Sequence, residues 1–69
     1  MKLSARNILK GKVKEIKKGA VNSEVIIELS NNVELVSIIT NTSADSLGLG
    51  KGKEVYAVIK ASNVLIGTD

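Results

Sequence analysis

The 69-residue chain contains no cysteine, histidine or proline. Without cysteine, disulfides and thiolate metal sites are excluded, and without histidine there is no imidazole ligand or proton carrier near neutral pH. Tyr56 is the only aromatic residue. No apolar run approaches the roughly 18 residues that cross a bilayer, and Met1–Ser4 lack the apolar core of a signal peptide. We therefore expect a soluble cytoplasmic protein with no membrane segment.

The apolar residues that are present make up 43% of the chain and are almost all aliphatic. This is a normal fraction for a folded domain, and we expect a single domain over residues 1–69. So short a chain buries only about 60% of the surface that it exposes when unfolded. With disulfides and soft metal sites excluded, oligomerisation is the remaining way to supplement the core. The net charge of +3 favours an anionic partner without identifying it.

Alternation of apolar and polar residues predicts three strands in the first half of the chain. Leu9, Gly11 and Val13 alternate with lysines, and the phase slips at Glu15-Ile16, as at a β-bulge. Gly19 and the run Ser30-Asn31-Asn32 are typical of turns. The predicted strands cover residues 7–18, 21–29 and 33–39.

The pattern changes in the second half. Thr42-Ser43-Ala44-Asp45 resembles a capping box and predicts a short helix to about Leu47, with Gly48 as its left-handed cap. Residues 53–60 and 62–66 are the fourth and fifth predicted strands. This order predicts an all-β fold, a five-stranded OB-fold-like Greek-key barrel with one short helix between strands 3 and 4. A plain meander or an SH3-like barrel is the competing architecture.

Two of the predicted strands are apolar on both faces, which indicates that both faces are covered. In the third strand Val36 and Ile38 lie opposite the main apolar face, and in the fourth Tyr56 and Val58 do so. A second subunit is the expected cover, against the alternative of scattered surface residues. The main faces comprise Val33, Leu35 and Ile39 in the third strand, and Val55, Ala57 and Ile59 in the fourth.

Catalytic chemistry finds little support. Glu24 and Glu28 share one strand face, but that spacing is typical of a solvated face and not of a catalytic carboxylate pair. The run Gly48-Leu49-Gly50-Lys51-Gly52 lacks the helix and hydroxyl of a phosphate-binding loop, so a turn is favoured. We predict a protein that is not an enzyme, with no catalytic residues and no metal-ion ligands.

Anion binding is better supported. Ser4-Ala5-Arg6-Asn7 offers a hydroxyl, a guanidinium and an amide, and Lys60-Ala61-Ser62 offers an ammonium group, a hydroxyl and backbone N–H groups. Such charge-assisted donors suit a tetrahedral oxyanion. Thr40-Asn41-Thr42-Ser43 adds hydroxyls beside the predicted helix. On composition alone, however, a polar strand end and a helix cap are the preferred explanation of these segments.

The basic stripe of Lys10, Lys12, Lys14, Lys17 and Lys18 raises a second possibility, because OB-folds often bind single-stranded nucleic acid through basic grooves and aromatic platforms. The single tyrosine cannot stack successive bases, so a solvated strand face is the preferred interpretation. A purely structural oligomerisation module is a third alternative.

Nearly the whole chain resembles the molbindins, a family of small molybdate-binding proteins. The two end motifs, SARN and IKAS, occur in the family's order and spacing. The stretches that carry the resemblance are Ser4–Asn7, Gly11–Val13, Glu24–Val25, Ile39–Thr40, Ser43–Leu49 and Val55–Val64.

This resemblance implies an OB-type barrel that assembles as a hexamer, a trimer of dimers, and holds molybdate or tungstate between subunits for molybdenum storage and homeostasis. It implies that Arg6 and Lys60 neutralise the dianion and that Ser4, Ser62 and the Ala61 N–H donate hydrogen bonds. Ala5 and Asn7 complete the first segment, Asn7 at its edge, and Thr40 would come from the neighbouring subunit. A second oxyanion site is expected at Gly19, Ala20, Val21, Asn22 and Ser23. Neither nucleic acid nor a membrane is an expected partner.

Overall fold

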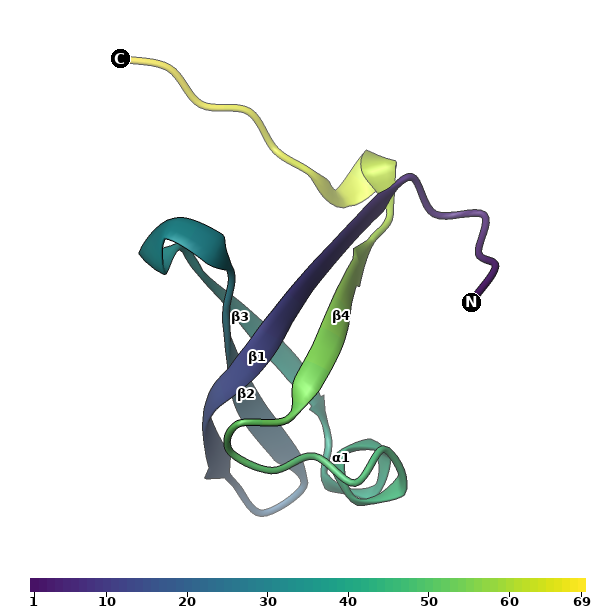
Figure 1. Ribbon diagram of the computed structural model, residues 1–69, viewed down its shortest axis with the longest axis vertical. Helices are drawn as coiled ribbons and strands as arrows, with labels where there is room; N and C mark the ends of the chain where they lie inside the picture. Colours follow the sequence, from purple (N-terminus) through teal and green to yellow (C-terminus); the bar gives the residue numbers. More distant parts are fainter.

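The computed structural model describes residues 1–69 and contains one curled antiparallel sheet with a short helix at one end (Figure 1). Both terminal segments join the sheet at the opposite end from this helix. The elements are β1 (Asn7–Lys18), β2 (Asn22–Glu28), a 3₁₀ turn η1 (Ser30–Asn32), β3 (Glu34–Thr40), α1 (Asn41–Ser46), β4 (Glu54–Ile59) and a second 3₁₀ turn η2 (Ala61–Asn63).

The long strand β1 pairs with two different strands along its length. Its first half, Asn7–Lys12, pairs with β4, and its second half, from Lys12 to Lys18, pairs with β2. The register shifts between Val13 and Glu15, so the predicted bulge is confirmed within one residue. The resulting order β3-β2-β1-β4 places β4 beside β1, which excludes a plain meander and agrees with an OB-like curl.

The predicted fifth strand over residues 62–66 is wrong. Residues 61–63 form η2, and the chain from Val64 onward has no regular structure. The sheet therefore has four strands and is an open half-barrel, not a closed five-stranded barrel. The apolar pattern of this segment is strand-like, but a strand forms only where a neighbour accepts its backbone hydrogen bonds, and in the isolated chain this segment leaves the sheet (Figure 1).

The helix was predicted correctly, but its N-terminal cap was not. Thr40, two residues before the expected Thr42, is the cap, and its hydroxyl accepts a hydrogen bond from the Ser43 N–H at 3.0 Å. Gly48 follows the helix at φ 61°, as predicted. Lys53 Nζ donates to the Leu47 carbonyl at 2.8 Å, and thereby satisfies an orphan acceptor at the helix end. No helix of the protein combines the length and apolar character needed to cross a membrane.

The core is small. Val13, Val25, Ile27 and Ala57 form its centre, and only 6 of the 69 residues are buried. The outer faces of the two edge strands are apolar as predicted. Val36 and Ile38 of β3, and Tyr56 and Val58 of β4, are 61%, 60%, 55% and 45% exposed.

Gly11 permits the close crossing of β1 over β2, and we predict that Gly11→Ala destabilises the protein. A Cβ atom at this position would lie 2.6 Å from the Glu28 carbonyl oxygen and 2.8 Å from Ile27 Cγ2. Such overpacking costs about 1–3 kcal/mol in unfolding free energy, measurable by urea denaturation. Gly50→Ala is the matched control, because no atom lies within 4 Å of its Cβ position. Equal stability of the two variants would contradict this account.

Candidate functional site

The two polar segments at the ends of the chain meet because β1 and β4 are antiparallel neighbours. Ser4–Arg6 precede β1 and Lys60–Ser62 follow β4, while Asn7 and Ile59 face each other in the register. The Asn7 side-chain amide donates to the Ile59 carbonyl at 3.3 Å and ties the strand ends together. Asn7 therefore links the strand ends from which the two segments extend, and it does not line the hollow between them.

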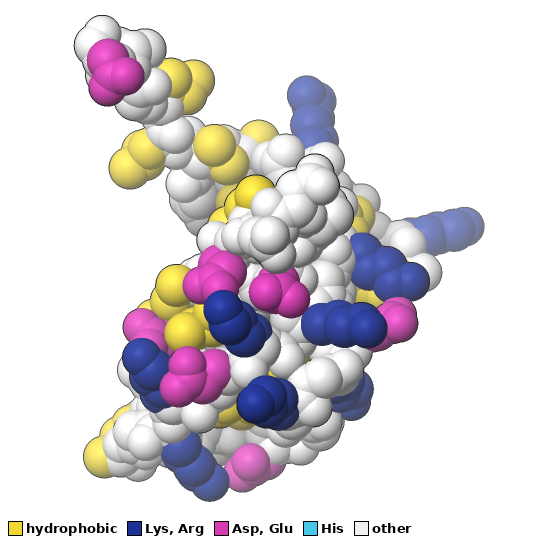
Figure 2. Space-filling model, turned by 60° about the vertical axis from the view of Figure 1, so that its left-hand side comes forward, with side chains coloured by type: hydrophobic (Ala, Val, Ile, Leu, Met, Phe, Trp, Pro, Cys, Tyr) yellow, Lys and Arg dark blue, Asp and Glu magenta, His cyan; other side chains and the backbone are white.

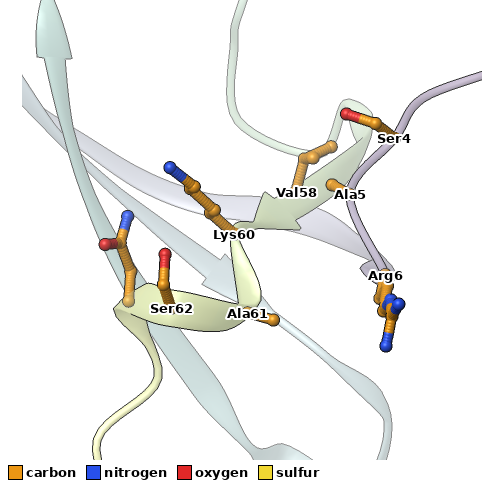
Figure 3. Close-up of a pocket in the computed structure, with 8 residues that line it drawn as sticks. Ser4, Ala5, Arg6, Val58, Lys60, Ala61 and Ser62 are labelled. Atoms are coloured by element: carbon orange, nitrogen blue, oxygen red, sulfur yellow. The ribbon is translucent and has the colours of Figure 1, made fainter.

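Between the two segments lies an open hollow of about 640 Å³. Arg6 and Lys60 are the only charged residues in its lining, and no carboxylate borders it. Figure 3 shows its residues, which are Ser4, Ala5, Arg6, Val58, Lys60, Ala61, Ser62 and Asn63. Six of these were predicted as site residues from the sequence. Val58 and Asn63 were not predicted. Asn63 was missed because a strand was expected over residues 62–66, where the structure has the turn η2.

The side chains that line the hollow do not all point toward one common centre (Figure 3). Lys60 and Ser62 extend to the same side of the chain, whereas the Arg6 guanidinium points away from the Lys60 ammonium group. The turn η2 is held by its own backbone, with Asn63 N–H donating to the Lys60 carbonyl at 2.8 Å. The N–H of Ala61 starts this turn and donates no hydrogen bond within the chain. The hollow thus offers cationic, hydroxyl and backbone donors, and every polar side chain in it is exposed.

Thr40 lies at the other end of the sheet. It pairs with Asn22, beside the Lys18 end of β1, whereas the hollow is at the Asn7 end of that 12-residue strand. A strand of that length spans on the order of 35 Å, so Thr40 cannot contact an ion held by Arg6 and Lys60 of the same chain. Its hydroxyl is also engaged locally, donating to Ser43 Oγ at 2.9 Å.

Hydrogen bonds join the turn from Gly19 to Ser23 to the first residue of α1. Ser23 is 2% exposed, and its hydroxyl donates to Asn41 Oδ1 at 2.5 Å. Asn41 Nδ2 in turn donates to the Gly19 carbonyl at 2.9 Å. None of the hollows on the isolated chain is lined by this turn. The Ser23 side chain is therefore a structural link, while Val21 is 70% exposed.

Three of the five lysines in the stripe on β1 form ion pairs with carboxylates. Figure 2 shows Lys and Arg side chains interleaved with Asp and Glu over this part of the surface. Glu34 raises the pKa of Lys14 through a hydrogen bond and its charge. The ion pairs are Lys10–Glu54 at 3.2 Å, Lys14–Glu34, and Lys17–Glu24 at 3.8 Å. A surface of alternating charge does not form the continuous basic groove of a single-strand-binding protein.

Comparison with known proteins identifies a family for the whole length of the chain. Residues 3–66 match the TOBE domain. Molybdenum-pterin-binding protein 1 of Clostridium pasteurianum is 46% identical over 66 residues, which cover 96% of this chain and 97% of that protein.

Two solved structures have the same fold. MopII from Clostridium pasteurianum superposes with a TM-score of 0.92 at 43% identity, over 97% of this chain and all of that one. The cytoplasmic molybdate-binding protein ModG, in a crystal form with molybdate bound, superposes with a TM-score of 0.96 at 49% identity. This chain is fully covered by that match and corresponds to 49% of the ModG chain.

Because Thr40 caps α1, we predict that Thr40→Val lowers the stability of the protein without any ligand. Loss of an N-cap hydroxyl costs about 0.5–2 kcal/mol in unfolding free energy. Thr40→Ser retains the capping oxygen and is the matched control. Chemical denaturation of both variants gives the comparison, and a Thr40→Val protein as stable as Thr40→Ser would show that the cap contributes nothing.

Proposed function

The chain belongs to the molbindin group of TOBE-domain proteins, and on this basis we propose that it binds molybdate without transforming it. The observation that carries the proposal is the hollow at the joined chain ends, which presents two cations and several hydrogen-bond donors with no carboxylate. The relatives are named as binding proteins, and the chain is a binding protein and not an enzyme.

We assign the charge neutralisation to Arg6 and Lys60. Molybdate is a dianion at neutral pH, and two cationic side chains match its charge. Burial of an unpaired charge is expensive, so the ion must be held by charge-assisted hydrogen bonds. The planar fork of Arg6 suits two oxygens of one tetrahedral face, provided that the guanidinium turns toward Lys60 on binding.

The remaining donors come from the same two segments. Ser4 and Ser62 donate their hydroxyl hydrogens, and the free N–H of Ala61 donates from the start of η2. Ala5 contributes to the wall of the hollow, and Asn7 supports it through the bond to Ile59. A shell of donors alone favours fully deprotonated oxyanions, because a protonated one would place its hydrogen against a donor.

A hollow as open as this one does not remove an ion from water, so we propose that a second subunit closes it. Thr40 of that subunit would complete the shell. Such an arrangement would let Thr40 contact the ion even though it lies at the opposite end of the sheet from the hollow of its own subunit. The small core and the apolar outer faces of β3 and β4 support assembly. We propose the hexamer of the family, a trimer of dimers, as the functional form, with residues 1–69 acting as one domain.

The physiological role that we propose is molybdenum storage and homeostasis in the cytoplasm. Binding without chemical change suits a reservoir, and one relative, ModG, is described as cytoplasmic. Tungstate, which is nearly isosteric with molybdate, would bind the same site. The turn from Gly19 to Ser23 is the proposed second oxyanion site. Its donors would be backbone N–H groups and the exposed Asn22 amide, because the Ser23 hydroxyl is already bonded to Asn41.

We predict saturable heat on titrating the assembled protein with molybdate and none with sulfate. Sulfate has the same charge and shape but is smaller, and rigid strand ends cannot contract around it. Tungstate serves as the positive control and should bind with an affinity close to that of molybdate. The absence of heat with molybdate, in protein shown to be folded, would refute the proposed function.

Replacement of one cation tests the assignment of residues. We expect Arg6→Ala to weaken molybdate binding by about 1.5–3 kcal/mol, the value of a charged hydrogen bond. Lys12→Ala removes the same charge from the outer face of β1, away from the hollow, and should leave the affinity within a factor of about two. If both variants lost affinity equally, net charge and not a specific contact of Arg6 would explain the binding.

A further inference from the structure

The hollow at the joined chain ends has one apolar side, which Val58 forms. Of the eight lining residues three are hydrophobic, and two of these, Ala5 and Ala61, carry only a methyl group. Val58 is therefore the one sizeable apolar side chain in the hollow, and it is 45% exposed. In Figure 3 it lies between Ser4 and the Lys60 ammonium group. An ion held among the polar groups of the hollow meets the methyl groups of Val58 on one side.

The pairing of β1 with β4 holds Val58 in place. Val58 lies directly opposite Ile8 in the register, and side chains so placed pack against each other on one face of the sheet. Ile8 does not line the hollow, so it supports Val58 from the neighbouring strand. A β-branched side chain is also stiff at χ1. The apolar side is thus built into the sheet, whereas the polar side chains of the hollow come from the segments before β1 and after β4.

On the basis of the proposed function, we propose that Val58 is a specificity-determining residue, which favours large, weakly hydrated dianions over small, strongly hydrated ones. A hydroxyl, a backbone N–H or a cationic side chain can replace a water molecule that the ion loses on entering the hollow. The methyl groups of Val58 cannot, because they donate no hydrogen bond. One side of the bound ion therefore loses its water without compensation.

The cost of this loss depends on the size of the ion. Removing water from an ion costs more free energy when the same charge is confined to a smaller radius, as in the Born description of solvation. Sulfate and molybdate both carry two negative charges, and sulfate is the smaller ion. Contact with Val58 therefore penalises sulfate more than molybdate, while the donors of the hollow serve both ions. This selection by hydration acts in addition to the selection by size that rigid strand ends impose.

The substitution Val58→Thr tests this role, because it retains the volume and the β-branched shape of valine and exchanges one methyl group for a hydroxyl. A hydroxyl at this place can donate to the ion and should favour the ion that loses more hydration. We expect the ratio of the sulfate to the molybdate dissociation constant to fall about tenfold or more. Titration with molybdate at increasing sulfate concentrations gives both constants. Since both are measured on one protein, a change in its stability cancels in the ratio.

Two further variants separate polarity from other effects of the substitution. Val58→Ile changes the size of the side chain and keeps it apolar, so the ratio should not fall below that of the wild type. Val33→Thr makes the same chemical change at a 52% exposed residue that does not line the hollow, and it should leave the ratio within a factor of about two.

The outcomes distinguish this inference from the function on which it rests. A wild-type ratio in Val58→Thr, in protein that binds molybdate, would overturn the role of Val58 and leave the proposed function standing. An equal fall in Val58→Ile would also overturn it, because the size of the side chain and not its polarity would then set the selectivity. If the wild type bound no molybdate at all, the proposed function would fall, and the role of Val58 with it.

Discussion

The split pairing of β1 is the constraint on which the rest of the structure depends. One strand of 12 residues pairs with β4 over its first half and with β2 over its second, and a bulge separates the two halves. The sheet must therefore curl, and the beginning of β1 must lie beside the end of β4. Two polar segments that are more than 50 residues apart in the chain thus become neighbours, as the bond from Asn7 to Ile59 shows.

The same pairing distributes charge unequally over the surface. Lysines of β1 form ion pairs with glutamates of the other three strands: Lys17 with Glu24 of β2, Lys14 with Glu34 of β3, and Lys10 with Glu54 of β4. Arg6 and Lys60 lie beyond the strand ends, where no ion pair forms with either of them. Lys12 and Lys18 of the stripe also form no ion pair, but the stripe has glutamates beside it, whereas no carboxylate borders the hollow. Local arrangement, more than total charge, decides which anion the protein can attract.

The sequence was sufficient for much of the fold and for the composition of the hollow. Alternation located β1 to β4 to within one or two residues, since one face of each strand is less exposed than the other. It failed at residues 62–66, because periodicity records an apolar segment and not the presence of a partner strand. It also misplaced the helix cap, since Thr40 and Thr42 are chemically alike and only the backbone angles of Thr40 distinguish them. The orientation of the Arg6 side chain and the distance of Thr40 from the hollow could not be predicted. They depend on how the strands pair in three dimensions, which the local sequence pattern does not specify.

The placement of Thr40 and the hollow at opposite ends of β1 has a consequence for symmetry. In a pair of subunits related by a twofold axis, each copy can offer its Thr40 end to the hollow of the other, so such a contact is reciprocal and closes on itself. On the proposed site, every pair then contains two equivalent hollows, and each subunit accounts for one bound ion. An ion lost from one hollow leaves the other hollow of the same pair intact.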